Sequence, residues 1–224
     1  MTDAAPTTEE RARRSLGSSG DAIYRMVQRA VQARHPGGGT LVDVGCGSGG
    51  LWPHVRPCFA RYVGVDVVRY DGFPAEGEFH ALDLDRGEVP LPDGIADVAA
   101  GVETIEHLEN PRAFVRMLAR LARPGGWVIV TTPNQHSLLS KGTFLLRGEH
   151  VHFQDASYPA HITALLAADL RRMAAECGLT DIGIEYSGAG RIPATPRHWP
   201  GALTRLLPRA FSDNLLLAAQ KPHG

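Results

Sequence analysis

The segment from Leu41 to Gly50 constrains this chain more than any other, because it reads as a buried strand that runs into a glycine-rich turn. Gly45, Gly47 and Gly49 let the backbone turn sharply and approach a ligand that a Cβ atom would push away. Asp43 stands two residues before the first of these glycines. The segment therefore predicts a turn that holds a nucleotide-like cofactor beside a carboxylate.

Two cofactor classes fit this glycine pattern. Gly45, Gly47 and Gly50 also satisfy G-x-G-x-x-G, the fingerprint of dinucleotide-binding oxidoreductases. Asp43 favours the other class, because a carboxylate repels a pyrophosphate in a partly dry site. A cofactor that carries an ammonium and a sulfonium group gains from the same carboxylate.

Strand-like and helix-like segments alternate along most of the chain. The helical pattern is clear at 21–35, 111–122 and 164–177, where apolar residues recur at a spacing of three and four. Strand-like runs are found at 40–45, 61–66, 78–84, 95–101, 127–132, 180–187 and 214–220. This alternation predicts an α/β fold, a Rossmann-like, doubly wound and mainly parallel sheet of seven strands. The last two strands lack an obvious intervening helix, which indicates an antiparallel pair at the sheet edge.

Length and composition are those of one domain. Residues 1–20 are expected to form a flexible or weakly helical arm, and 21–224 the domain itself. The three cysteines form no C-x-x-C pair, which favours a reducing compartment, and no apolar run reaches the length of a membrane span. We therefore expect a cytoplasmic protein.

Acidic residues end the second and third strand-like runs. In open α/β sheets the ligand lies over the carboxyl ends of the strands. Asp66 ends the second run at the distance from the glycine turn that suits a carboxylate binding a ribose diol. Asp83 follows the third run.

Asp-x-Gly-x-Gly-x-Gly, together with Arg-Pro-Gly-Gly-Trp-Val-Ile-Val at 123–130, resembles the class I S-adenosylmethionine-dependent methyltransferases. The resemblance covers 40–220 and is strongest to the type 11 group, which includes the ubiquinone-biosynthesis O-methyltransferases. It implies S-adenosylmethionine as cofactor, a reversed seventh strand, and an acid near Asp83 against the adenine. The cofactor-binding residues it implies are Asp43, Gly45, Cys46, Gly47, Gly49, Asp66, Val67, Asp83, Leu84 and Val102.

Glu103, Glu106 and His107 follow the fourth strand, over which the transferred methyl group is expected. An alcohol or phenol must lose its proton on methylation, and an imidazole is suited to accept it near neutral pH. His107 is therefore the predicted general base of an O-methyltransferase. Glu103 and Glu106 are predicted to support it, although Glu103 could instead face the cofactor and Glu106 cap the next helix.

A helical turn here would place the three side chains on one face, and Glu-x-x-Glu-His resembles the metal-binding segment of small-RNA 3′-terminal 2′-O-methyltransferases. The fourth ligand would come from His150, His152 or His161. Carboxylates with imidazoles suit Mg²⁺, Mn²⁺ or Fe²⁺, and such a cation would lower the pKa of a bound diol. A divalent cation bound by Glu103, Glu106, His107 and His161 therefore stays open as an alternative.

The segment 133–160, after the fifth strand, is expected to be a lid that selects the acceptor. Its apolar and aromatic residues favour a hydrophobic or ring-bearing small molecule, such as a quinone, a sugar or a natural product. The connection at 188–212 combines leucines, Trp199 and arginines, and could cover the cleft, form a homodimer contact or touch a membrane.

The formal charge of the whole chain is −1, which argues against nucleic acid as a partner. The alternatives left open are N- or C-methylation, metal-dependent 2′-O-methylation of RNA, a nicotinamide-dependent oxidoreductase and a non-catalytic binding domain.

Overall fold

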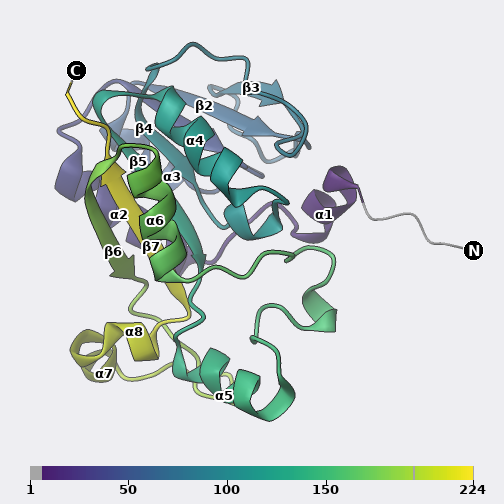
Figure 1. The fold of residues 1–224 in the computed structure, drawn as a ribbon. Coiled ribbons are helices and arrows are strands. Elements are labelled where there is room, and N and C mark those ends of the chain that lie inside the picture. The colour runs from purple at the N-terminus through teal and green to yellow at the C-terminus, as the bar shows by residue number, and fades with distance from the viewer. Residues whose placement is uncertain (1–6, 194, 224) are drawn as a thin grey trace, which may run out of the picture.

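A computed structural model describes residues 7–193 and 195–223, which form one seven-stranded sheet between two layers of helices (Figure 1). The strand order is β3-β2-β1-β4-β5-β7-β6, and β7 alone runs antiparallel to its neighbours. The strands are β1 (Thr40–Val44), β2 (Arg61–Asp66), β3 (Glu78–Ala81), β4 (Ala96–Gly101), β5 (Ala122–Pro133), β6 (Thr180–Tyr186) and β7 (Asn214–Gln220). The predicted fold, including its reversed last strand, is confirmed.

Helices cover both faces of the sheet. Figure 1 shows α4 and α6 in front of it and α2 and α3 behind it. The helices are α1 (Thr8–Arg14), α2 (Asp21–Arg34), α3 (Trp52–Val55), α4 (Pro111–Leu121), α5 (Leu138–Arg147), α6 (Ala167–Glu176), α7 (Gly201–Leu206) and α8 (Pro208–Phe211). Short 3₁₀ turns are η1 (Arg56–Cys58), η2 (Ile105–His107) and η3 (Asp155–Ser157).

The core is divided by the sheet into two apolar layers. Successive side chains of a strand point to opposite faces, so Val128 and Val130 of β5 pack with α4 and α6, and Ile129 packs with α2 and α3. All three are fully buried. The sheet is therefore covered on both faces, as its long apolar strands predict.

The parallel register brings the carboxyl ends of the central strands together. In β1, Asp43 lies opposite Gly64 of β2 and Ala100 of β4. β5 and β7 are antiparallel, with Asn214 opposite Pro133. The first residue of β7 consequently lies at the same edge of the sheet as the last residues of the parallel strands.

The third strand is shorter than predicted. Strand pairing ends at Ala81, and the Leu82 N–H then donates to the Asp66 carbonyl at 2.9 Å. The Asp83 carbonyl next accepts from the N–H groups of Arg86 and Gly87. The backbone therefore turns where the apolar sequence continued to resemble a strand.

The N-terminal segment, predicted as an arm over 1–20, is helical from residue 8 to residue 14. Thr7 and Glu10 form a capping box that starts α1, and Arg11 is buried. Residues 1–6 lie outside the described residues, and the flexibility of the arm stays a prediction. No helix in the described part of the chain has the length and apolar character to cross a membrane.

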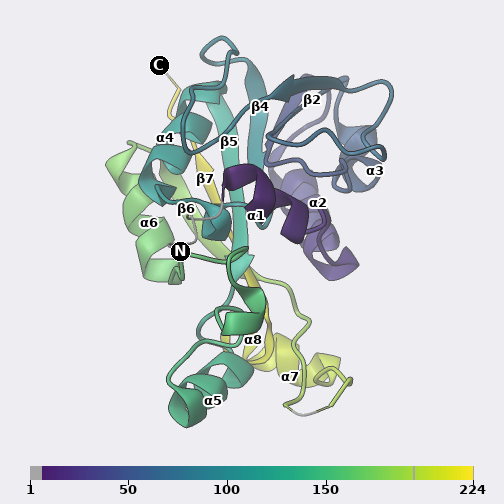
Figure 2. The same ribbon diagram turned by 90° about the vertical axis from the view of Figure 1, so that its right-hand side faces the viewer.

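Three helices lie apart from the sheet layers. Both views place α5, α7 and α8 together below the sheet (Figures 1 and 2). α5 belongs to the predicted lid, and the short helices α7 and α8 fall in the connection at 188–212. Pro200 precedes α7 and Pro208 is the first residue of α8, consistent with the fixed φ of proline at helix starts.

Candidate active site

A cavity of about 430 Å³ opens over the carboxyl ends of β1, β2 and β4. Its walls come from the glycine turn after β1, the turn after β2, η2 and the start of β7, and from residues 8–20 of the N-terminal segment. His152 and His161, which flank the end of the predicted lid, also line it. In open α/β sheets, ligands bind at the carboxyl ends of the strands, at the point where the strand order reverses, and the cavity lies at this point.

The glycine turn is built on backbone conformations that only glycine adopts easily. Gly45 has φ +79° and Gly47 φ +53°. The N–H groups of Gly45 and Cys46 donate to the Val65 carbonyl at 2.7 and 3.1 Å, which fixes the turn on β2. A Cβ on Gly47 would lie 2.2 Å from the carbonyl oxygen of Gly17. The turn therefore has no room for a side chain beneath the N-terminal segment.

Two buried carboxylates lie beside this turn. Asp43 is 1% exposed; its Oδ2 accepts from the Tyr62 hydroxyl at 3.0 Å, and its Oδ1 has no partner. Burial raises the pKa of Asp43 to about 7. The Asp66 carboxylate accepts from the N–H groups of Gly47 and Val68 at 2.8 and 3.1 Å, and burial raises its pKa too. Both groups would be favoured in their charged forms by a cationic or hydroxyl-bearing ligand.

Most residues predicted to bind the cofactor line this cavity. These are Asp43, Gly45, Cys46, Gly47, Asp66, Val67, Leu84 and Val102. Gly49 and Asp83 do not line it. A Cβ on Gly49 would meet Pro74, and the Asp83 side chain turns away to accept from the Asp85 N–H at 3.0 Å.

Glu103 stands at a strained position between β4 and η2. Its φ is +50°, an uncommon conformation for a residue with a side chain. The Glu103 N–H donates to Thr131 Oγ1 at 2.9 Å, and the Asn214 amide donates to Glu103 Oε2 at 2.8 Å. Burial raises the pKa of Glu103 to about 7, and its Oε1 has no partner. Glu103 is thus held from two other strands and faces the cavity.

Glu106 is the most isolated acid of the site. It is 0% exposed, and neither carboxylate oxygen has a hydrogen-bond partner among the described residues. Burial, together with the nearby Glu103 charge, raises the pKa of Glu106 well above its ordinary value. A fully buried carboxyl group without partners is costly, and such groups point to a function.

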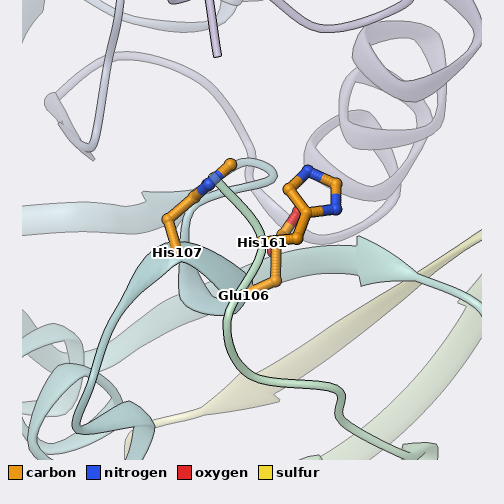
Figure 3. Close-up of side chains that lie close together, drawn as sticks. All are labelled: Glu106, His107 and His161. Carbon is orange, nitrogen blue, oxygen red and sulfur yellow. The ribbon is translucent and has the colours of Figure 1, made fainter. Parts of the chain in front are cut away.

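Two histidines face Glu106 (Figure 3). His107 follows it in η2, and His161 comes from the segment after the lid. One ligand atom from each of the three side chains lies within 4.8 Å of the others. The carbonyls of Ala160 and His152 lie 2.7 and 2.8 Å from Nδ1 of His107 and His161. Each carbonyl can only accept, so the proton is on Nδ1 and Nε2 is left as an acceptor.

Burial is the largest cause of the lowered pKa values of both imidazoles. The pKa of His107 falls to about 4, and the neighbouring His161 also lowers it. The pKa of His161 is lowered as well. His107 therefore remains neutral at and above about pH 5, with one nitrogen able to accept a proton or bind a metal.

The expected helical face of Glu103, Glu106 and His107 does not form. Only Ile105–His107 is helical, as one 3₁₀ turn, and Glu103 lies before it with positive φ. The positive φ breaks the spacing that a continuous helix would need, so Glu103 points to Asn214 and is not in the three-residue cluster. Of the other candidate ligands, His150 Nδ1 lies 2.9 Å from Ser140 Oγ, whereas His152 lines the cavity.

Several lining residues were not predicted from the sequence. Arg11 of α1 forms a salt bridge with Asp85 at 2.5 Å, both side chains nearly buried, beside the cavity. Arg191 and Asp213 pair at 3.0 Å at the opposite wall. Tyr24 and Tyr70 also contribute. The Thr7–Glu10 capping pattern is the sequence signal that could have indicated an ordered α1, but no local pattern signals where that helix packs.

The fold of this chain matches that of the class I methyltransferases, whose sheet ends in a reversed seventh strand. The position of its cavity agrees with this class. The chain belongs to the family described as "Methyltransferase domain", whose profile matches residues 12–183. It is therefore a S-adenosylmethionine-dependent methyltransferase. The family assignment decides between the two cofactor classes that the glycine pattern allowed.

Three known proteins show the range of similarity. A probable S-adenosylmethionine-dependent methyltransferase of Mycolicibacterium smegmatis is 25% identical, over 95% of this chain and 81% of its own. The ubiquinone biosynthesis O-methyltransferase of Leptothrix cholodnii is 28% identical, over 81% of this chain and 77% of its own. A S-adenosylmethionine-dependent methyltransferase structure from Archaeoglobus fulgidus superposes with a TM-score of 0.65 at 16% identity, covering 93% and 97% of the two chains.

The cavity fits S-adenosylmethionine, the expected cofactor of this family. Oδ1 of Asp43 and Oε1 of Glu103 are buried acceptors without partners, and both residues line the cavity. The cofactor carries an ammonium donor and a sulfonium charge, which such acceptors stabilise. The glycine turn leaves its backbone open to the cavity.

We expect Glu106→Gln to stabilise the protein at neutral and alkaline pH. Folding raises the pKa of Glu106, so the folded state keeps the Glu106 proton at a pH where the unfolded state has lost it. The free energy of unfolding therefore falls as pH rises from the pKa of the unfolded state to that of the folded state. The glutamine side chain does not titrate, so Glu106→Gln does not lose stability in this way as pH rises. Calorimetric melting in chelator should show a variant Tm above that of the native protein at pH 8, by roughly 2–4 °C per kcal/mol regained. The difference should shrink toward pH 5.

The exposed Glu88 provides the control, because Glu88→Gln removes a carboxylate that stays in water. Its Tm should follow that of the native protein across the pH range. A Glu106→Gln protein that melts below the native one at every pH would contradict the argument.

Proposed function

We propose that this enzyme methylates an oxygen atom of a small-molecule acceptor, with His107 as general base. The observation that carries the proposal is the His107 ring, which is held through Nδ1 and lines the same cavity as the glycine turn. An alcohol or phenol must lose a proton during methylation, whereas a neutral amine already has a free electron pair. A proton acceptor beside the cofactor cavity therefore favours oxygen over nitrogen.

We assign the cofactor to the β1–β2 side of the cavity. Asp43 and Glu103 would bind the amino-acid end, Asp66 the ribose diol, and Leu84 with Val67 the adenine. Asp66 can take this role because each carboxylate oxygen accepts more than one hydrogen bond. S-adenosylmethionine supplies an electrophilic methyl group when bound. The residues of the chain orient the acceptor, exclude water and take up its proton.

His107 alone is a weak base, because its pKa is lowered to about 4. Glu106 can compensate only in its ionised form, which burial disfavours and which the imidazolium formed when Nε2 takes the proton would in turn favour. The Ala160 carbonyl holds the ring through Nδ1 during this transfer. In this proposal Glu106 supports the base from a water-free position.

A divalent cation is the second candidate for activating the acceptor. Glu106, His107 and His161 present their ligand atoms within 4.8 Å of one another. Metal-binding imidazoles commonly donate their other ring N–H to a carbonyl, and both histidines do so here. One carboxylate and two imidazoles suit Mn²⁺ or Fe²⁺. A cation there would lower the pKa of a bound hydroxyl and ease the demand on His107.

Two observations bear on the class of the methyl acceptor: the contacts of the segment 133–160 with His107, and the names of relatives. We propose that residues 21–224 form the catalytic domain and 133–160 its lid, because Ala160 at the end of that segment and His161 directly after it both contact His107. Relatives named for ubiquinone biosynthesis make a ring-bearing, quinone-like acceptor the favoured one. A catechol of that kind would present a hydroxyl to His107 and a second oxygen to a cation.

The first test concerns Asp43 and uses S-adenosylhomocysteine, whose ammonium group needs the ionised carboxylate. Because the pKa of Asp43 is about 7, native affinity should rise with pH through about 7 and then level off. Asp43→Asn should weaken binding by about tenfold or more at pH 8 and reduce the pH dependence to the part that Glu103 contributes. Isothermal titration at pH 6 and pH 8 measures both effects. An undiminished slope in Asp43→Asn would contradict the role of Asp43.

The second test concerns His107. His107→Ala should lower kcat by about 10²- to 10⁴-fold while changing the affinity for S-adenosylhomocysteine less than twofold. Methyl transfer to a panel of catechols and phenols provides the turnover, and titration provides the affinity. His80→Ala on β3, outside the cavity, is the matched control and should retain both. Loss of cofactor binding in His107→Ala would move this residue into the cofactor site.

The third test concerns the cation. Mn²⁺ added to the chelator-treated complex with S-adenosylhomocysteine should release its own binding heat, which His161→Ala should weaken and Glu106→Gln should abolish. Glu106→Gln should have the larger effect because Glu106 is the only charged ligand of the three-residue cluster, whereas His161→Ala leaves the carboxylate and one imidazole. Native heat that is unchanged in Glu106→Gln places the cation elsewhere. An absence of any heat leaves His107 as the unassisted base.

A further inference from the structure

The helices below the sheet (Figure 1) carry exposed apolar side chains that the site does not use. Leu145 and Leu146 at the end of α5 are 83% and 87% exposed, and Leu206 at the end of α7 is 74% exposed. With Leu138, Phe144, Leu203 and Leu207 they include most of the exposed large hydrophobic residues among those described. We call this set, together with the five cations named next, the leucine–arginine face.

The same helices and the loop before α7 also carry exposed cations. These are Lys141, Arg147, Arg197, Arg205 and Arg209. None of them forms an ion pair with a described residue, although many arginines elsewhere in the structure do. Within 138–150 and 195–211 the only acidic residue is Glu149. A chain with a formal charge of −1 thus concentrates unpaired positive charge in one place.

The leucine–arginine face is joined to the wall of the cavity. Asn134, at the end of β5, donates from its side chain to the carbonyls of Arg209 and Ser212 at 2.8 Å. Its N–H donates to the Asp213 carbonyl at 2.7 Å. Asp213 and its partner Arg191 line the cavity. These bonds hold the end of α8 next to the wall of the cavity, and Figure 2 shows α8 directly below the sheet.

We propose that the leucine–arginine face binds the surface of an anionic lipid bilayer. Leucines that reach past the headgroups, with arginines at the level of the phosphates, are the side chains that stabilise a protein in the membrane interface. The unpaired cations supply the charge complementarity that a second copy of this chain would lack, because the same face on that copy is also positive. The protein would bind from one side, without a spanning helix.

This position has a consequence for the acceptor, which rests on the proposed function. A face next to the cavity would place the site at the level of the lipid headgroups. A quinone-like acceptor dissolved in the bilayer could then enter between the lid and the connection at 188–212, past Arg191 and His152. The matching substrate class is a phenol or catechol with an apolar tail.

The test is flotation of the full chain with vesicles. Native protein should float with vesicles of phosphatidylcholine and phosphatidylglycerol, and much less with phosphatidylcholine alone or at high salt. The double variant Leu145→Asp/Leu146→Asp should lower the bound fraction at least about tenfold. Arg205→Glu and Arg209→Glu should each lower it by about fivefold or more.

Two variants outside the face are the matched controls. Leu166→Asp changes a half-exposed leucine at the start of α6, and Arg29→Glu reverses an exposed charge on α2. Both should float like the native protein. Equal losses in face and control variants, or native protein that fails to float with anionic vesicles, would overturn the proposal. A native dimer that dissociates in Leu145→Asp/Leu146→Asp without any vesicle binding would show instead that the face joins two copies.

Titration with S-adenosylhomocysteine separates this proposal from the function on which the acceptor class rests. Each face variant should bind it with native affinity, because no substituted residue lines the cavity. Protein that binds the ligand but not vesicles refutes the membrane surface alone. Protein that binds vesicles but not the ligand refutes the assignment of the cavity.

Discussion

The parallel pairing of β1 with both β2 and β4 is the constraint on which the rest of the structure depends. It places Asp43 and the glycine turn over the point where the strand order changes direction. The N–H groups of Gly45 and Cys46 then attach the turn to the Val65 carbonyl. The backbone therefore positions the cofactor cavity, while the side chains around it remain available for chemistry.

The electrostatics of the cavity follow from burial more than from ion pairing. Asp43, Glu103 and Glu106 lie where water is largely absent, and each has at least one carboxylate oxygen without a partner. The same dry environment keeps His107 neutral. Carboxyl groups and imidazoles that are uncompensated in this way are stabilised by a bound ligand, which supplies the missing donors and charge.

The sequence predicted the sheet and its reversed last strand, and most residues that it singled out for cofactor binding line one cavity, because the glycine turn and the strand ends are local features. The side of the site formed by distant segments was not predictable in this way. Asn214 contacts Glu103, and Arg11 contacts Asp85, across long stretches of chain. Asp83 does not line the cavity, because the strand before it ends early and its carboxylate accepts from the Asp85 N–H instead.

The antiparallel direction of β7 has a consequence for how this enzyme folds during its synthesis. Because β7 runs against its neighbours, Asn214 reaches the site and its amide donates to Glu103. Thr8, near the other end of the described chain, lines the same cavity. The ribosome must release β7 before the cavity is complete, so the nascent chain cannot gain stability from the cofactor until Asn214 has been synthesised and has left the ribosome.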